Sequence, residues 1–103
     1  MTEAQYRARR AILRNAEEFT VAGTPHQGIF TIISPGSARR FLDDAAIEAA
    51  GRPLWLIVVP DTDTTEEADD IDWDSMTLTV LKVVRRLLRG DLLYKALIAH
   101  VAP

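Results

Sequence analysis

Residues 71–101 read Ile71-Asp-Trp-Asp-Ser-Met76-Thr-Leu-Thr-Val-Leu-Lys-Val-Val-Arg-Arg-Leu-Leu-Arg-Gly90-Asp-Leu-Leu-Tyr-Lys-Ala-Leu-Ile-Ala-His-Val101, the most informative pattern in the chain. The pattern predicts a short strand over residues 71–73, a tight turn at Asp74-Ser75 and a long strand over about residues 76–85. A second turn falls at Arg89-Gly90-Asp91, where Gly90 supplies positive φ and Asp91 local hydrogen bonding. The chain then returns as a strand over residues 92–101.

A single helix over residues 76–88 is the competing interpretation of this stretch. Its apolar positions approximate a helical stripe: Leu78, Leu81, Val84 and Leu88. Period alone does not separate a short buried strand from a helix. β-Branched residues fit a pleated sheet better than a helix, and five stand here: Thr77, Thr79, Val80, Val83 and Val84. Together with the turn chemistry they favour the hairpin.

Length and composition bound the class of protein. The chain has 103 residues, no cysteine and a formal net charge of -3. A domain of this size buries roughly 60–70% of the surface of its unfolded chain, so it needs no disulfide or metal to fold. The lack of cysteine excludes disulfides, thiolate metal sites and a cysteine nucleophile. The acidic balance argues against specific nucleic-acid binding, and no apolar run reaches the ~20 residues of a membrane span. We expect a soluble cytosolic protein with no membrane partner.

The N-terminal part predicts alternating helices and strands. Thr2 and Gln5 match a capping box that opens a helix over about residues 3–17. Two strands, over residues 19–22 and 28–33, are expected to pair across a loop that contains His26. A helix over residues 38–50 follows, with Ser37 as its N-cap and a glycine after its end. The apolar run over residues 54–59 then predicts a strand at the centre of the sheet.

These elements predict one α+β domain over residues 1–103. Residues 1–18 hold the N-terminal helix, residues 19–60 hold strands and the helix at 37–50, and residues 71–103 hold the C-terminal strands. Residues 61–70 are expected to form an acidic mobile loop, because like charges repel and few apolar groups offset the cost of ordering. Asp70, Asp72 and Asp74 resemble the start of a calcium loop, but Ser75 and Leu81 stand where that loop needs Gly and Glu. We expect no metal and no cofactor.

Charge of opposite sign at two places indicates an assembly protein. Three arginines gather near one end of the predicted hairpin, and the acidic segment contains no Lys or Arg. Two such patches favour head-to-tail contact between copies, although they could equally pair within one chain or face solvent. The predicted interface residues are Asp61, Asp63, Glu66, Glu67, Asp69, Asp70, Arg85, Arg86 and Arg89.

The sequence also bears on two other classes of protein, an enzyme and a small regulatory protein. An enzyme should show a nucleophile, a base and an orienting group, and His26 and His100 stand in no such local pattern. We therefore expect no catalytic residues, and expect His100 to be a packed histidine. A small regulatory or antitoxin-like protein, with the acidic loop on a basic partner, remains open as the alternative function.

The order of motifs resembles the small head–tail connector (neck) proteins of tailed bacteriophages and prophages. The matching pieces are Gly28-Ile29-Phe30, Pro53-Leu54-Trp55-Leu56, Ile71-Asp72-Trp73-Asp74-Ser75 and Leu78-Thr79-Val80. Two features differ: those proteins usually carry Gly at position 75, and the predicted helix at 38–50 is longer than their variable segment.

The resemblance implies a fold and a place of action. The fold would be a small antiparallel β-barrel or curled sheet with an N-terminal helix and one further helix between strands. The subunits would assemble as a ring at the virion neck, contacting copies of themselves, the portal and the tail. Before assembly the chain would reside in the host-cell cytoplasm, and the isolated chain could be monomeric. The family offers no catalytic residues.

Overall fold

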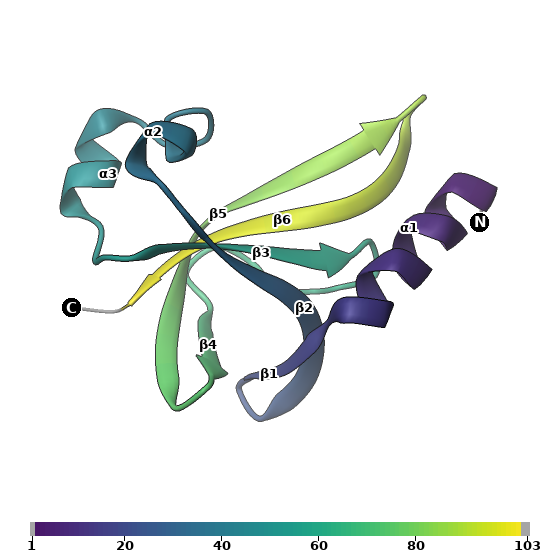
Figure 1. The fold of residues 1–103 in the computed structure, drawn as a ribbon, viewed down its shortest axis with the longest axis horizontal. Coiled ribbons are helices and arrows are strands. Elements are labelled where there is room, and N and C mark those ends of the chain that lie inside the picture. Colours follow the sequence, from purple (N-terminus) through teal and green to yellow (C-terminus); the bar gives the residue numbers. More distant parts are fainter. Residues whose placement is uncertain (1, 102–103) are drawn as a thin grey trace.

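The computed structural model describes residues 2–101, which form a closed antiparallel β-barrel with three helices (Figure 1). The elements in chain order are α1 (Glu3–Asn15), β1 (Glu17–Val21), β2 (Thr24–Ile33), α2 (Pro35–Ala38), α3 (Asp44–Ala49), β3 (Leu54–Pro60), β4 (Asp70–Trp73), β5 (Met76–Leu88) and β6 (Asp91–Val101). The strands pair in the order β1-β2-β3-β6-β5-β4, and β4 pairs back with β1. The predicted α+β barrel is confirmed.

The C-terminal stretch forms the predicted hairpin and not the competing helix. The two-residue turn at Asp74-Ser75 has φ of 48° and 61°, and the turn at Arg89-Gly90 has φ of 52° and 85°. Positive φ at both central residues is the geometry that matches the right-handed twist of the flanking strands. Ser75 therefore adopts the left-handed conformation for which glycine is the usual residue.

One core fills the barrel. Its fully buried side chains come from all strands except β2: Phe19, Ile57, Val59, Ile71, Leu78, Val80, Leu97 and Ala99. On β2, Gly28 faces this core, and a Cβ there would lie 2.9 Å from Ile57 Cγ2 and 3.0 Å from Val59 Cγ1. The absence of a side chain at Gly28 thus lets β2 approach β3 closely. At the same core, Phe30 and Trp73 stack with ring centroids 3.9 Å apart.

β3 is paired on both sides, as predicted for the apolar run. It lies between β2 and β6, with Ile57 opposite Phe30 on one side and Leu97 on the other. Ile57 points into the barrel core, whereas Leu54 packs into a second cluster with Ala38 and Ile47. Leu56 and Val58 are only half-buried, so the outer face of the strand is covered only in part.

The predicted helix over residues 37–50 is wrong, because the structure breaks it into α2 and α3. Ser34 caps α2 by accepting a hydrogen bond from the Ser37 amide, and Pro35 occupies the first turn. Asp43 accepts a hydrogen bond of 2.8 Å from the Ala46 amide and starts α3. An aspartate side chain that caps a new helix competes with continuation of the preceding helix through the same residues. The prediction of one helix followed the spacing of apolar residues and did not consider this cap.

The N-terminal segment is mostly as predicted. The capping box is present: the Thr2 amide donates to Gln5 Oε1 (2.9 Å) and the Gln5 amide donates to Thr2 Oγ1 (3.2 Å). α1 ends at Asn15, slightly earlier than expected. β1 and β2 do pair, but through a two-residue turn at Ala22-Gly23, so His26 lies within β2 and not in a loop.

The helices within residues 2–101 are all too short or too polar to cross a bilayer.

Ile57 offers a direct test of the core. Ile57→Ala should lower the free energy of unfolding by about 2–5 kcal/mol, because it removes buried methyl groups and leaves a cavity. The matched control is Ile32→Ala, since Ile32 is the same side chain at 59% exposure. Urea unfolding measures both variants. Equal losses in the two would contradict the assignment of Ile57 to the core.

Candidate functional site

The acidic loop over residues 61–69, which joins β3 to β4, is held against the barrel by cations from distant parts of the chain. Asp61 accepts two hydrogen bonds from Arg9 on α1, from Nε and from Nη2, each 3.1 Å long. This bidentate geometry is the strong form of a carboxylate–guanidinium contact. Hydrogen bonding to Asp61, helped by charge attraction, raises the pKa of Arg9 above its usual value, and burial opposes this only in part.

Asp63 anchors the middle of the loop. Its side chain is 4% exposed, and its Oδ2 lies 2.8 Å from Nδ1 of His26. Its Oδ1 accepts a hydrogen bond of 2.8 Å from the Thr65 amide, and its carbonyl accepts one of 2.6 Å from Lys95 Nζ. His26 in turn stacks on Phe19, with ring centroids 5.3 Å apart. A buried carboxylate needs such partners, and here they join the loop to β1, β2 and β6.

The end of the loop follows β5. The Ala68 amide donates to the Val80 carbonyl (2.8 Å), and the Val80 amide donates to the Asp69 carbonyl (2.9 Å). Asp69 Oδ2 also accepts from the Glu66 amide. The loop backbone is therefore hydrogen-bonded at both its centre and its end.

Mobility of the acidic loop stays a prediction, but the loop carboxylates are not all unpaired, contrary to what that prediction assumed. The expectation assumed carboxylates without counter-charge and a segment with nothing to bury. The structure instead buries Asp63 and Thr65 and supplies Arg9, His26 and Lys95 from elsewhere. Glu66 and Glu67 are the exposed acidic residues at the loop surface.

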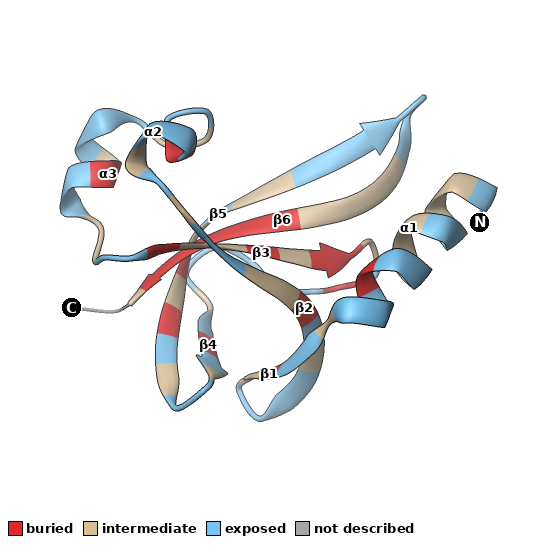
Figure 2. Ribbon diagram, viewed as in Figure 1, coloured by how far each residue is buried: buried red, intermediate tan, exposed pale blue. Residues whose placement is uncertain are grey.

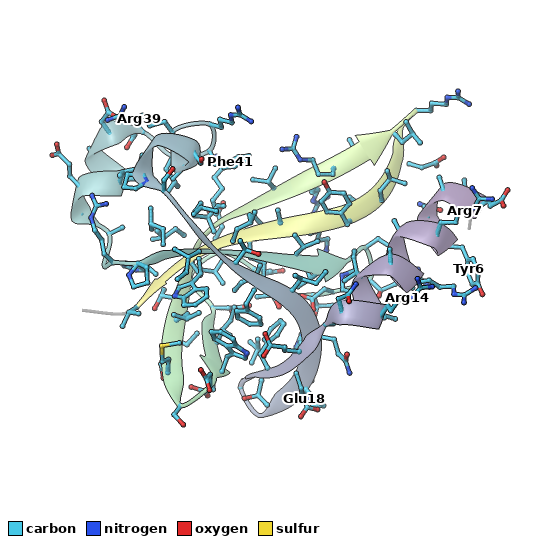
Figure 3. All side chains as sticks on the ribbon, viewed as in Figure 1. Tyr6, Arg7, Arg14, Glu18, Arg39 and Phe41 are labelled. Atoms are coloured by element: carbon cyan, nitrogen blue, oxygen red, sulfur yellow. The ribbon has the colours of Figure 1, made fainter. Side chains whose placement is uncertain are left out.

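The three arginines predicted to form one cluster lie apart. Arg85 lines a hollow of about 480 Å³ whose opposite wall is the loop itself, including Asp61, Asp63, Glu66 and Glu67. Arg86 lies on the other face of β5, since successive side chains of a strand alternate. Its Cζ is 5.7 Å from the ring centroid of Phe41, which lies between the α2–α3 connection and β5 (Figure 3). Arg89 occupies the turn at the tip of the hairpin.

The remaining acidic residues have local partners on the barrel wall. Asp70 and Asp72 on β4 accept hydrogen bonds from the hydroxyls of Thr79 and Thr77 on β5. Across residues 2–101, no group of three or more His, Asp or Glu side chains is arranged to hold a metal ion.

The environment of one histidine was predicted from the sequence, and that of the other was not. His100 is buried, and its Nδ1 accepts a hydrogen bond of 2.7 Å from the Gly51 amide, which confirms a packed histidine. The pairing of His26 with Asp63 was missed. The two residues are 37 positions apart, and no motif at that spacing signals the contact.

The hairpin tip was also missed as a candidate site. β5 and β6 run on beyond the rest of the barrel, and the outer end of β5 is exposed (Figure 2). Leu87 and Leu88 there are 61% and 47% exposed. The sequence signal was present, since two adjacent leucines cannot both face one side of a strand. The predicted strand ended at about residue 85, so neither leucine was given a role from the sequence.

Removing the Asp63 carboxylate tests the loop anchor. Asp63→Ala should destabilise the protein by about 1–3 kcal/mol, because buried donors lose their acceptor. Amide hydrogen exchange at Thr65 should also accelerate. The control is Glu67→Ala, an exposed carboxylate of the same loop, which should change neither reading. Unchanged exchange at Thr65 in Asp63→Ala would show that the loop is held by other contacts.

Comparison with known proteins returns no similarity on which to base a function. No protein-family model matches this chain, and no curated protein or solved structure is significantly similar to it. We therefore infer its function from its fold, its contacts and its exposed surfaces.

Proposed function

We propose that this protein is a structural subunit of a head–tail connector in a tailed bacteriophage or prophage. It would be made in the host-cell cytoplasm and act at the virion neck, in a ring of copies between portal and tail. The closed antiparallel barrel with an N-terminal helix supports the proposal, because it is the fold expected from the resemblance in sequence. Its role is to occupy a place in an assembly and not to turn over a substrate.

The observation that carries the proposal is the exposed apolar tip of the β5–β6 hairpin. Leu87 pairs with Leu92, and Leu88 pairs with Asp91, at the far end of a strand of 13 residues. Covering a leucine side chain fully is worth about 1.5–3 kcal/mol. Two adjacent leucines held out on a projecting hairpin therefore form a natural anchor for a protein partner.

The strand edges of the barrel indicate where a partner could bind. A strand at the edge of an open sheet can bind a neighbour through its free backbone groups. β1 and β4 pair with each other, so these two strands leave no such edge where they meet. β5, however, pairs with β4 only over residues 76–79, and its outer part toward the tip pairs with β6 alone. A partner at the tip therefore meets this strand edge together with the exposed side chains of Leu87 and Leu88.

Charged side chains are a second set of groups through which subunits could meet. Six of the nine predicted interface residues are exposed, and within residues 2–101 none of the six takes part in an ion pair: Glu66, Glu67, Asp70, Arg85, Arg86 and Arg89. A contact between these groups on neighbouring subunits stays a prediction. Exposed pairs of this kind are worth about 0–1 kcal/mol each, so the apolar tip is the stronger determinant.

The alternative of a regulatory or antitoxin-like protein is less well supported. Such a protein would present its loop carboxylates to a basic partner. Here Asp61 and Asp63 are already engaged by Arg9 and His26 of the same chain. Glu66 and Glu67 remain for a partner, and the exposed Asp70 that follows the loop already accepts a hydrogen bond from Thr79.

Polar substitution of the tip tests the proposal. Analytical ultracentrifugation of the protein at increasing concentration should detect self-association. Leu87→Ser with Leu88→Ser should raise the concentration needed by tenfold or more, because the buried apolar surface is lost. Leu13→Ser is the matched control, since Leu13 is 45% exposed on α1 and should leave association unchanged.

Negative-stain electron microscopy gives the second reading. Closed rings of the concentrated wild-type protein are expected. Discrete two-fold dimers, or association unaffected by the two serines, would contradict the proposal.

A further inference from the structure

We infer that the hairpin tip of one subunit docks into an apolar hollow at the opposite end of the next copy of the same chain. This inference rests on the proposed function and names the receiving surface that assembly would use. The tip consists of Leu87, Leu88, the turn residues Arg89 and Gly90, and Asp91. The hollow lies where β2 ends and β3 begins.

The hollow has the lining that an apolar anchor needs. It measures about 580 Å³ and is lined mainly by Ile32, Ile33, Pro35, Pro53 and Leu54. This volume falls within the roughly 300–1,000 Å³ of ordinary binding pockets. Ile32 at its rim is 59% exposed, a large apolar side chain that a partner would cover.

A charged group stands on each side of the proposed contact. Arg52 lines the hollow, and Asp91 follows the turn at the hairpin tip. Both residues are exposed, and neither joins an ion pair within the part of the chain that the structure describes. The carboxylate of Asp91 is complementary to the guanidinium of Arg52, whereas Arg89 in the same tip has the same charge as Arg52. The contact is therefore favoured only in a register that places Asp91 next to Arg52 and Arg89 away from it.

The positions of the two surfaces determine the type of assembly. The tip of the β5–β6 hairpin and the segments that line the hollow, where β2 ends and β3 begins, lie at opposite ends of the molecule in Figure 1. They are separated along its longest axis, which extends 40 Å. One chain therefore cannot fill its own hollow. A contact between two different surfaces is heterologous, and it produces a ring when the rotation between subunits closes. The arrangement thus matches the proposed ring.

Engineered cysteines test the contact directly, because the natural chain has no cysteine. Ile32→Cys places a thiol at the hollow and Leu88→Cys places one at the tip, both at exposed positions. A disulfide forms only when the two Cα atoms come within about 4.4–6.8 Å. Mild oxidation at high protein concentration, followed by a non-reducing gel, measures the result.

The expected pattern distinguishes this contact from others. A 1:1 mixture of the two single variants should yield a covalent dimer, and the double variant should yield a ladder of higher species. Each single variant alone should remain monomeric on the gel. The control double variant, Leu13→Cys with Leu88→Cys, should give no ladder. Dimers from one single variant alone would indicate a two-fold contact and overturn the inference.

Charge reversal tests the register. Arg52→Asp should weaken association by roughly three- to tenfold, because it removes one exposed pair and adds a repulsive one. Asp91→Arg added to it should restore association. If Arg52→Asp strengthens association instead, the hollow faces Arg89 and the proposed register is wrong.

Sedimentation of the wild-type protein, together with the crosslinking result, distinguishes failure of the tip-to-hollow contact from failure of the connector role. Oligomers without tip-to-hollow crosslinks would overturn this contact and leave the connector role standing. A chain that stays monomeric at every concentration and forms no crosslink would overturn this contact and the expected spontaneous ring, but not the connector role, because the resemblance allows the isolated chain to be monomeric.

Discussion

The pairing of β6 with strands on both sides is the constraint on which the rest of the structure depends. β6 pairs with β3 from Leu54 to Pro60 on one side, and with β5 along its length on the other. Each peripheral segment is also tied to it. The Leu92 carbonyl accepts a hydrogen bond from Gln5 on α1, Lys95 donates to the acidic loop, and His100 accepts from Gly51 before β3. Loss of this strand would therefore open the barrel and release the helix, the loop and the insertion together.

A β-bulge in β5 reconciles the barrel with its second core. The register between β5 and β6 shifts between Val80 and Lys82, which leaves Leu81 unpaired. An extra residue in one strand bends it and increases its twist. Val80 faces the barrel core and Leu81 packs against the cluster of Ala38, Ile47 and Leu54 under α2 and α3, as alternation along a strand requires. The extra residue shifts this alternation, so that Val83 beyond the bulge also packs against the barrel core. Beyond the bulge, β5 continues outward to the exposed tip.

Local chemistry explains which elements were predictable from sequence. The turns, the β-branched strand, the apolar run of β3 and the capping box of α1 each depend on residues close together in the chain, and each is as predicted. One failure is also local, since the cap at Asp43 divides the helix predicted over residues 37–50. The other failures are contacts between distant residues. Asp61 meets Arg9 across 52 positions, and Asp63 meets His26 across 37. Charge composition therefore made the loop look unpaired. The predicted arginine cluster failed for a different reason. Side chains alternate along a strand, so Arg85 and Arg86 point to opposite faces of β5, and their closeness in sequence does not place them in one cluster.

The internal pairing of the loop has a consequence for assembly. Identical subunits in a ring bring like charges together, and a chain of net charge -3 gains repulsion with each copy added. Arg9 pairs with Asp61 within each subunit, and Asp63 is buried against His26, so fewer of the loop carboxylates face a neighbour. Screening at physiological salt limits the remaining repulsion between subunits to about 8 Å.

The apolar surface that the copies can cover then decides whether they associate. In this chain the large exposed apolar side chains are the tip leucines, Ile32 at the opposite end of the molecule, and Tyr6 and Leu13 on α1. In the ring proposed above, a chain of this kind would stay apart from its copies when dilute and would associate in one direction when an assembly site raises its local concentration.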